Sequence, residues 1–529
     1  MSRSKDRKWA VLLILCISLL VVSLDDTVLN VALPDIVRSL HASSSDLQWV
    51  VDTYAVVFAG LLLVFGSLGD RLGRKWVLLG GLAVFGSSSA ASAFATAPEG
   101  LIAARAVMGI GAAAIMPSTL SILTNVFVVP DERSRAIGIW SGTTGLGVAV
   151  GPVVGGWLLS RFWWGSVFLV NVPICLLAVA AVTALVPNSR DKSAKRPDAL
   201  GAGLSTGGIA LLLWGIIEAP TQGWSSLRVI ATTCAGIIGL AGFVLWERHS
   251  DHPMLELSLF RSRRFAGAVS AMALVIFGLM GGLFLFTQYL QFALGFSALE
   301  TGVRIAPIAL VLMAVAPLSS VLDRRIGTKP VVATGMALVA VAFALLTSTS
   351  TASSYWQSFP AFLLMGIGVG LAFAPCTEAV MGSVALDKAG VGSATNSASL
   401  QIGGATGVAV LGSLLNARYK ARMSRTLAPY HLTHSVTALI ESSLGGALAV
   451  AERAPAHLGA LLSSAARGAF VSGMDLAVVA ATGVVGAAVF LVVAALPNRP
   501  KLPDDKGSLL AAGREQSGTA ADHESARRS

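Results

Sequence analysis

Apolar stretches of about 20 residues recur along this 529-residue chain and constrain its fold more than any other feature. A helix needs roughly 20 mostly apolar residues to cross the hydrocarbon core of a bilayer. Hydrophobic residues make up 54% of the chain and charged residues only 12%, a balance that excludes a soluble globular protein. The sequence therefore predicts an all-α integral membrane protein with fourteen transmembrane helices. We place them near residues 9–31, 49–68, 77–96, 101–124, 135–159, 165–186, 200–219, 228–247, 266–292, 301–320, 330–348, 358–381, 396–415 and 471–494.

The basic residues predict how these helices are oriented. Lys and Arg are concentrated in alternate connections, such as the one at 66–75, whereas the short connections between them hold only Arg38, Arg161 and Arg228. Because positive residues favour cytoplasmic loops, we expect a multi-pass plasma-membrane protein with both termini in the cytoplasm. The long connection at 416–470 is placed outside although it is basic, since long loops cross largely regardless of charge. The net charge of +10 is then a topology signal, and no nucleic-acid partner is expected.

The positions of the cysteines and histidines, and the absence of a phosphate-binding motif, argue against disulfides, metal sites and ATP binding. The four cysteines lie singly in different apolar stretches, and the seven histidines fall in predicted loops or tails. Neither a disulfide nor a metal site is expected. No Walker-type loop is present, so ATP is not the expected energy source.

Ionisable residues within the apolar stretches are the main candidates for function, because a charge at the centre of a membrane helix costs about 2.5–3.5 kcal/mol. Asp25, Asp52 and Arg105 are predicted at a similar depth, in the first, second and fourth helices. A carboxylate beside a fixed positive charge can release and rebind a proton, which makes these residues candidates for proton coupling. A static salt bridge at Arg105 and an interfacial helix N-terminal charge at Asp52 are the other interpretations. Glu378, near the inner end of the twelfth helix, is either a further proton site or an interface acid.

The stretch GVAVGPVVGG at 147–156 predicts a close contact between two helices. Gly147, Gly151 and Gly155 share one helix face, and Pro152 provides a point where the helix can bend. Among lipids, close backbone approach is a main way to hold helices together. Packing alone is the other interpretation of this stretch.

Two turns on the predicted inner side resemble each other, which predicts an internal repeat. GSLGDRLGRK (66–75) and LDRRIGTK (322–329) both contain an Asp-Arg pair, and Gly73 aligns with Gly327. Two six-helix halves separated by two extra helices would place these turns eight helices apart, and many transporters are built from internal repeats.

Taken together, the motifs resemble those of the 14-helix drug:proton antiporters of the major facilitator superfamily. The resemblance rests on LDDTVLNVALP in the first helix, GSLGDRLGRK after the second, RAVMGIGAA in the fourth and GVAVGPVVGG in the fifth, with WWGSVFLVNVPI and QYLQ further along. It covers residues 9–494. It implies the major facilitator fold with 6 + 2 + 6 helices, rocker-switch alternating access, and export of lipophilic compounds in exchange for protons.

The resemblance also implies roles for particular residues. Asp25 and Arg105 become the proton-coupling candidates. The conformational gate is assigned to Gly69, Asp70, Arg71, Gly73 and Arg74. The antiporter motif is assigned to Gly147, Gly151, Pro152, Gly155 and Gly156.

The implied arrangement divides the chain into four parts. Residues 1–190 are expected to form an N-terminal six-helix bundle, and 191–262 two linker helices. Residues 263–496 are expected to form a C-terminal six-helix bundle that includes the outer loop 416–470. The remaining residues, 497–529, are polar and predict a disordered cytoplasmic tail.

Two kinds of residue are candidates for the substrate cavity: those that recur on one face of a helix, and the second acid of the first helix. Aromatic residues on one helix face also pack against neighbouring helices, which is the other interpretation. The candidates are Asp26, Phe58, Phe277, Phe284 and Gln288. Many relatives carry charges early in the thirteenth helix, where this chain has Ser397, Leu400 and Gln401, and no additional acid stands in the tenth helix. We therefore expect neutral, zwitterionic or monocationic substrates.

The expected function is proton-coupled efflux of lipophilic drugs or antibiotics by a protein that is not an enzyme, with the proton gradient in place of a cofactor. The expected partners are a small lipophilic substrate, protons and the lipid bilayer, for a chain that acts as a monomer. Two alternatives stay open: export of an endogenous metabolite, siderophore or lipid on the same fold, and a membrane-embedded receptor or enzyme. Against the second stands the lack of a metal-ligand cluster or a nucleophile motif in the sequence.

Overall fold

The computed structural model describes residues 2–40, 44–190, 198–250, 255, 257–351, 353–430 and 432–497. Every regular element within these residues is a helix, so the predicted all-α fold is confirmed. The predicted disordered tail, apart from Pro497, lies outside the described residues. The helices are α1 (Ser2–Leu40), α2 (Ser44–Leu72), α3 (Arg74–Ala93), α4 (Pro98–Val126), α5 (Pro130–Arg161), α6 (Ser166–Leu169), α7 (Asn171–Leu185), α8 (Ala199–Gln222), α9 (Leu227–His249), α10 (Arg263–Gln288), α11 (Ala298–Ile326), α12 (Thr328–Leu346), α13 (Tyr355–Met381), α14 (Ala389–Leu427), α15 (His434–Ser442), α16 (Leu444–Arg453) and α17 (Ala456–Ala495), with short turns η1 (Leu257–Arg261), η2 (Tyr289–Ala293) and η3 (Leu386–Lys388).

Among the described residues, thirteen helices are long and apolar enough to span a membrane, and one predicted span is missing from that set. The exception is α5, whose 32 residues include seven glycines and a charged first turn. At 1.5 Å per residue α5 is about 48 Å long, which is ample for a bilayer. Positions 148, 149 and 152 of α5 lie outside the residues whose side chains the structure describes, so α5 does not enter this set. The predicted count of fourteen is therefore not confirmed.

The glycines of α5 face two different helices. Gly147, Gly151 and Gly155 lie against α1, whereas Gly138, Gly142, Gly145 and Gly156 lie against α11. A Cβ atom on Gly151 would overlap Thr27 Oγ1 of α1. The hydroxyl of Thr27 also donates to the carbonyl of Gly147 at 3.4 Å. This helix is thus packed backbone to backbone between α1 and α11, as small residues allow in membranes.

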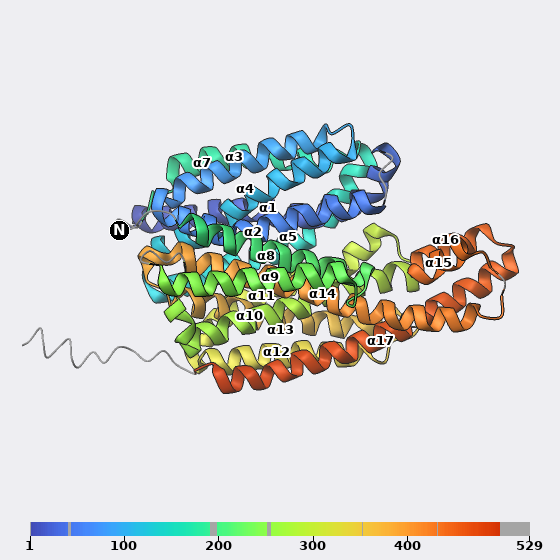
Figure 1. Cartoon of the computed structure of the whole chain (residues 1–529). Coiled ribbons are helices and arrows are strands. Elements are labelled where there is room, and N and C mark those ends of the chain that lie inside the picture. Colours follow the sequence, from blue (N-terminus) through green and yellow to red (C-terminus); the bar gives the residue numbers. More distant parts are fainter. Residues whose placement is uncertain are drawn as a thin grey trace, which may run out of the picture. The chain divides into compact units, whose positions relative to one another are not determined.

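Helices from each part of the chain pack mainly among themselves. The first set is α1 to α7, and the second is α10 to α14 with α17. The two sets meet where α5 packs on α11 and where α2 and α4 pack on α14. Helices α8 and α9 pack on each other, and α8 also contacts α2 and α14 (Figure 1). The predicted domain boundaries themselves stay predictions.

The connection predicted as an outer loop at 416–470 is largely helical. α14 continues to Leu427 and α17 begins at Ala456, so both helices run past the predicted ends of their spans. Between them lie α15 and α16 (Figure 1). Leu444 and Ala447 of α16 are buried. Helices extend into this connection because the backbone hydrogen bonds of a helix do not require apolar side chains, and its placement outside the membrane stays a prediction.

Candidate functional site

A buried ion pair joins α1 and α4. Arg105 Nη1 donates to Asp25 Oδ2, and each side chain is only 2% exposed. Arg105 Nε also donates to the carbonyl of Val50 on α2 at 3.1 Å, and the guanidinium lies 4.2 Å from the ring centroid of Tyr54. Buried charges persist when they are paired and hydrogen-bonded. Here the arginine of α4 is held by contacts to two other helices, α1 and α2.

A chain of hydrogen bonds continues from Asp25 to α3 and α7. Asn171 Nδ2 donates to Asp25 Oδ1 and to Ser89 Oγ, each at 3.1 Å. Ser89 in turn donates to the carbonyl of Phe168 at 2.8 Å. Asn171 is fully buried, and its Oδ1 has no hydrogen-bond partner within the described part of the chain. A buried carbonyl without a donor is costly, so this oxygen is placed to accept one.

Asp26 is the next residue of α1 and lies beside the pair. Its side chain is exposed, in contrast to Asp25, yet it lies within interaction range of Asp25, Arg105 and Tyr54. Ionisable side chains in membrane helices almost always face the interior of the bundle or a water-filled space. When both acids are ionised, the two negative charges and the single positive charge leave one net negative charge in this group.

The other predicted proton-coupling residues are placed differently. Asp52 is half-buried on α2, two residues from both Val50 and Tyr54, and therefore on another face of that helix. Glu378 lies near the C-terminal end of α13. The polar residues around it are Ser134, Arg133, Arg264 and Asp323. The structure therefore groups Asp25, Asp26 and Arg105, and it places Glu378 in a separate charged cluster.

The end of the bundle that carries the turn between α2 and α3 is called the basic end here. It holds a second polar group. Asp70, the third residue from the end of α2, accepts from the backbone N–H groups of Gly390 at 2.9 Å and Val391 at 3.2 Å, in the first turn of α14. A carboxylate at a helix N-terminus is stabilised by the free N–H groups and the helix dipole. Asp70 also accepts from Arg74 Nε at 2.8 Å, and Arg74 Nη2 donates to the carbonyl of Leu386 at 3.1 Å. These contacts connect α2 to the start of α14. We call the group of Asp70, Arg74, Leu386, Gly390 and Val391 the clasp.

The remaining gate candidates surround the clasp. The partner of Asp70 is Arg74, which is 1% exposed, whereas Arg71 is half-buried. Gly69 packs near the Arg74 side chain. Gly73 has a φ of +107°, a conformation that residues with side chains rarely adopt. The tight turn that positions Arg74 therefore requires glycine at 73.

The second turn of the predicted repeat has the same backbone feature. Gly327, between α11 and α12, has a φ of +93°. Its counterpart Gly73 also has a positive φ. Arg324 on α11 pairs with Asp131 on α5 at 3.5 Å and donates to its carbonyl at 3.0 Å. Both turns thus contribute a contact between the two sets of helices at the basic end.

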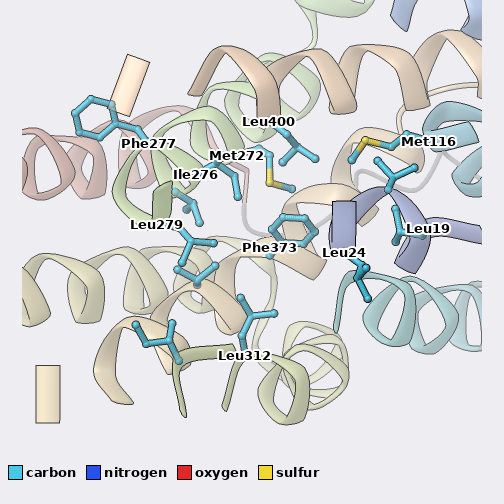
Figure 2. Packing of buried hydrophobic residues seen from close by; sticks show 14 of the residues in the cluster. Leu19, Leu24, Met116, Met272, Ile276, Phe277, Leu279, Leu312, Phe373 and Leu400 are labelled. Atoms are coloured by element: carbon cyan, nitrogen blue, oxygen red, sulfur yellow. The ribbon is translucent and has the colours of Figure 1, made fainter. Parts of the chain in front are cut away.

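Apolar side chains from both sets of helices meet in the middle of the bundle (Figure 2). The residues labelled there are Leu19, Leu24, Met116, Met272, Ile276, Phe277, Leu279, Leu312, Phe373 and Leu400. They come from α1, α4, α10, α11, α13 and α14. These side chains are buried, so they form a packed apolar core between the two sets of helices. Methionine side chains in such a core are flexible and repack readily.

The predicted cavity residues have different surroundings, and their role in a substrate cavity stays a prediction. Phe277 belongs to the central apolar group (Figure 2). Phe58 is 1% exposed and packs against Tyr54, so it is a core residue between α2 and α4. Phe284 and Gln288 are half-buried further along α10, towards the end opposite the basic end.

Sequence reasoning missed two residues of the ion-pair network, Asn171 and Tyr54. A signal existed for Asn171, since it is a lone amide inside the apolar run WWGSVFLVNVPI. Tyr54 carried no comparable signal. Among the described residues, no three His, Cys, Asp or Glu side chains lie together in a way that could hold a metal ion.

Comparisons with known proteins agree on one family. The family model described as Major Facilitator Superfamily matches residues 15–408. The chain is 36% identical over 496 residues to the multidrug efflux pump LfrA of Mycolicibacterium smegmatis, covering 94% of this chain and 96% of that protein. It is 32% identical over 509 residues to the tetracenomycin C resistance and export protein of Streptomyces glaucescens, covering 95% and 94%. Among solved structures, the human organic anion transporter MFSD10 has the same fold, with a TM-score of 0.60 at 15% identity over 92% of this chain and 99% of that chain.

Proposed function

Because this chain belongs to the major facilitator superfamily, we propose that it exports lipophilic drugs or antibiotics in exchange for protons by alternating access. The relatives named as multidrug efflux and antibiotic export proteins support this cargo class. The observation that carries the proposal is the buried pair of Asp25 and Arg105 beside the exposed Asp26. An acid next to a fixed positive charge can bind a proton in one state of the protein and release it in another.

Asn171 is the residue through which the protonation of Asp25 is sensed. When Asp25 is ionised, it accepts from Arg105 and from the amide of Asn171. When Asp25 is protonated, its carboxyl becomes a donor, and the unpartnered Oδ1 of Asn171 can accept from it after the amide turns over. Protonation thus weakens the link from α1 to α4 and strengthens the link from α1 to α7.

Replacing Asn171 with leucine is expected to lower proton-driven transport about tenfold or more, because a hydrogen bond to a charged group contributes about 1.5–3 kcal/mol. The measurement is the initial rate of uptake into proteoliposomes under an imposed pH gradient. Ser89→Ala is the matched control, since it removes a neighbour of Asn171 and leaves the contact to Asp25. Equal rates in the leucine variant and the wild type would remove Asn171 from the mechanism.

Helix α5 carries the change at Asp25 to the second set of helices. Thr27, two residues after Asp25, packs against Gly151 of α5, and the opposite face of α5 packs on α11. A shift of α1 therefore moves a helix that touches both sets. The clasp at Asp70 holds the basic end together while Asp26 is open to water from elsewhere. By the positive-inside rule the basic end is cytoplasmic, so this arrangement is the outward-facing one.

Alanine in place of Asp70 is expected to slow transport about tenfold while substrate binding changes little. The substitution removes the carboxylate that accepts from Gly390, Val391 and Arg74, and it leaves Arg74 buried without its acid. The outward-facing state should then be less populated. Comparing the rate of transport with the affinity for tetraphenylphosphonium separates the two effects. An affinity that falls as much as the rate would argue for a binding role instead.

We also propose how the protein is arranged in the membrane. Residues 1–190 and 263–496 are the two moving bundles, and the segment 191–262 lies between them. The protein acts as a monomer in the plasma membrane with both termini in the cytoplasm. It is a transporter and not an enzyme, and the proton gradient drives it without a cofactor.

Its substrates are neutral or carry one positive charge. The group around Asp26 has one net negative charge when both acids are ionised, which either a proton or a single cationic centre neutralises. The buried residues of Figure 2 become the apolar surface for the rest of the molecule when the two sets of helices move apart.

The test is efflux of ethidium, a lipophilic monocation, from cells with and without this protein, repeated after addition of a protonophore. Efflux that the protonophore stops supports drug:proton antiport. Efflux that persists without the gradient contradicts it. Absence of ethidium efflux would shift the cargo to an endogenous metabolite, siderophore or lipid on the same fold.

A further inference from the structure

A cavity of about 680 Å³ opens at the end of the bundle opposite the basic end, away from the proposed coupling site. It is formed by the connection before α11, the first turns of α11 and the start of α13. Its lining is mainly aromatic and apolar, with Phe296, Tyr355, Trp356 and Phe359 around one charged residue, Arg304. The proposed function does not use this cavity.

The guanidinium of Arg304 is held in place within the cavity. It lies 3.7 Å from the ring centroid of Phe296 and 5.8 Å from that of Tyr355. Its Nη1 donates to the carbonyl of Glu300 at 3.2 Å, and the hydroxyl of Tyr355 donates to the carbonyl of Arg304 at 3.0 Å. A guanidinium stacked on a ring keeps its edge free, and that edge matches the oxygens of a phosphate.

Glu300 only partly neutralises this charge. One of its oxygens, Oε2, accepts from the backbone N–H and the hydroxyl of Ser297 in a capping box at the start of α11. The other oxygen is 4.0 Å from Arg304 Nη1, beyond hydrogen-bond distance. Within the described residues, Nε and Nη2 of Arg304 have no hydrogen-bond acceptor. The arginine therefore retains donors for an external anion.

The surroundings of the cavity are those of a lipid-facing surface. Trp356 is 70% exposed and Val303 is 54% exposed at its rim. Below it, Leu310 and Leu318 of α11 are 49% and 64% exposed on the same face of the helix as Val303. Large apolar side chains on a spanning helix face acyl chains, and tryptophan is enriched at the headgroup level.

We propose that this cavity binds a membrane phospholipid, with its phosphate on Arg304 and an acyl chain along Val303, Leu310 and Leu318. The charge of Arg304 matches the phosphate, and the exposed stripe on α11 matches the chain. Given the proposed orientation, the lipid belongs to the outer leaflet. The site itself does not depend on what the protein transports.

Native mass spectrometry of the purified full-length protein tests this proposal with two lipids that have the same acyl chains. Dioleoyl phosphatidylglycerol carries the phosphate, and dioleoylglycerol lacks it. The wild type should retain the phospholipid and release the diacylglycerol. Arg304→Gln should lower phospholipid retention about tenfold, because charge-assisted hydrogen bonds are lost. Arg304→Lys keeps the charge and should retain part of the binding.

Arg161→Gln is the matched control, since Arg161 also lies at the end of the bundle opposite the basic end and stacks on a ring, that of Trp157, at 5.8 Å. It should bind phospholipid as the wild type does. Equal losses in the Arg161 and Arg304 variants would overturn the proposal in favour of general attraction to surface charge. So would equal retention of both lipids by the wild type. Stabilisation of the lipid-free protein by inorganic phosphate, lost in Arg304→Gln, would overturn it in favour of a free anion site.

Discussion

Asparagine in place of Asp25 is expected to abolish proton-driven transport. The side chain keeps its size, but it can no longer bind and release a proton. The exchange also leaves the buried Arg105 without its counter-charge, and breaking a buried ion pair destabilises proteins by about 3–5 kcal/mol. The measurement is substrate transport into proteoliposomes with and without an imposed pH gradient. A gradient-dependent rate equal to that of the wild type would remove Asp25 from coupling.

A second variant separates lost coupling from lost folding. In the double variant Asp25→Asn with Arg105→Gln, no unpaired charge is buried, so the protein should be more stable than the single variant and still uncoupled. Asp35→Asn makes the same change ten residues further along α1 and should leave coupling intact. Asp25→Glu retains an acid and should keep measurable activity. If the double variant regained coupling, another acid would have to carry the proton.

Leucine in place of Gly151 is expected to inactivate the protein nearly completely. Even the first carbon of a side chain at this position would overlap Thr27 Oγ1, so α1 and α5 must separate. Overpacking of this kind costs about 1–3 kcal/mol for modest additions, and leucine adds four carbons. The change also breaks the contact through which α1 moves α5. Transport rate and thermal stability of the purified protein are the two measurements.

Gly151→Ala allows a finer test of the same contact. Alone, it should lower the transport rate clearly, because Thr27 must move away. Combined with Thr27→Ala, which removes the overlapping hydroxyl, it should regain part of the rate. Gly483→Ala, on α17, is the matched control because its added Cβ meets no atom within 4 Å. Full activity of Gly151→Leu would mean that the close approach of α1 and α5 is not needed.

The local sequence was sufficient for the helical class of the fold and for the position of its main charges. Apolar stretches predict spans because a bilayer offers no partner to free backbone groups, which leaves the helix as the simplest solution. The depth of Asp25 and Arg105 followed from counting residues along two predicted helices, and the pairing found in the structure agrees with that depth. The spacing of Gly147, Gly151 and Gly155 likewise predicted a helix face in close contact with a neighbour, and α5 packs that face on α1.

Only the tertiary structure decided which neighbours these residues have. The sequence could not choose between Arg71 and Arg74 as the partner of Asp70, since the turn at Gly73 sets the direction of the chain. It also gave no reason to join Asn171 to Asp25, 146 residues away, or Arg304 to the ring of Tyr355. The pattern along a helix determines which face is apolar and at what depth a charge lies. Contacts between distant helices depend on how those faces pack together, and no single segment contains that information.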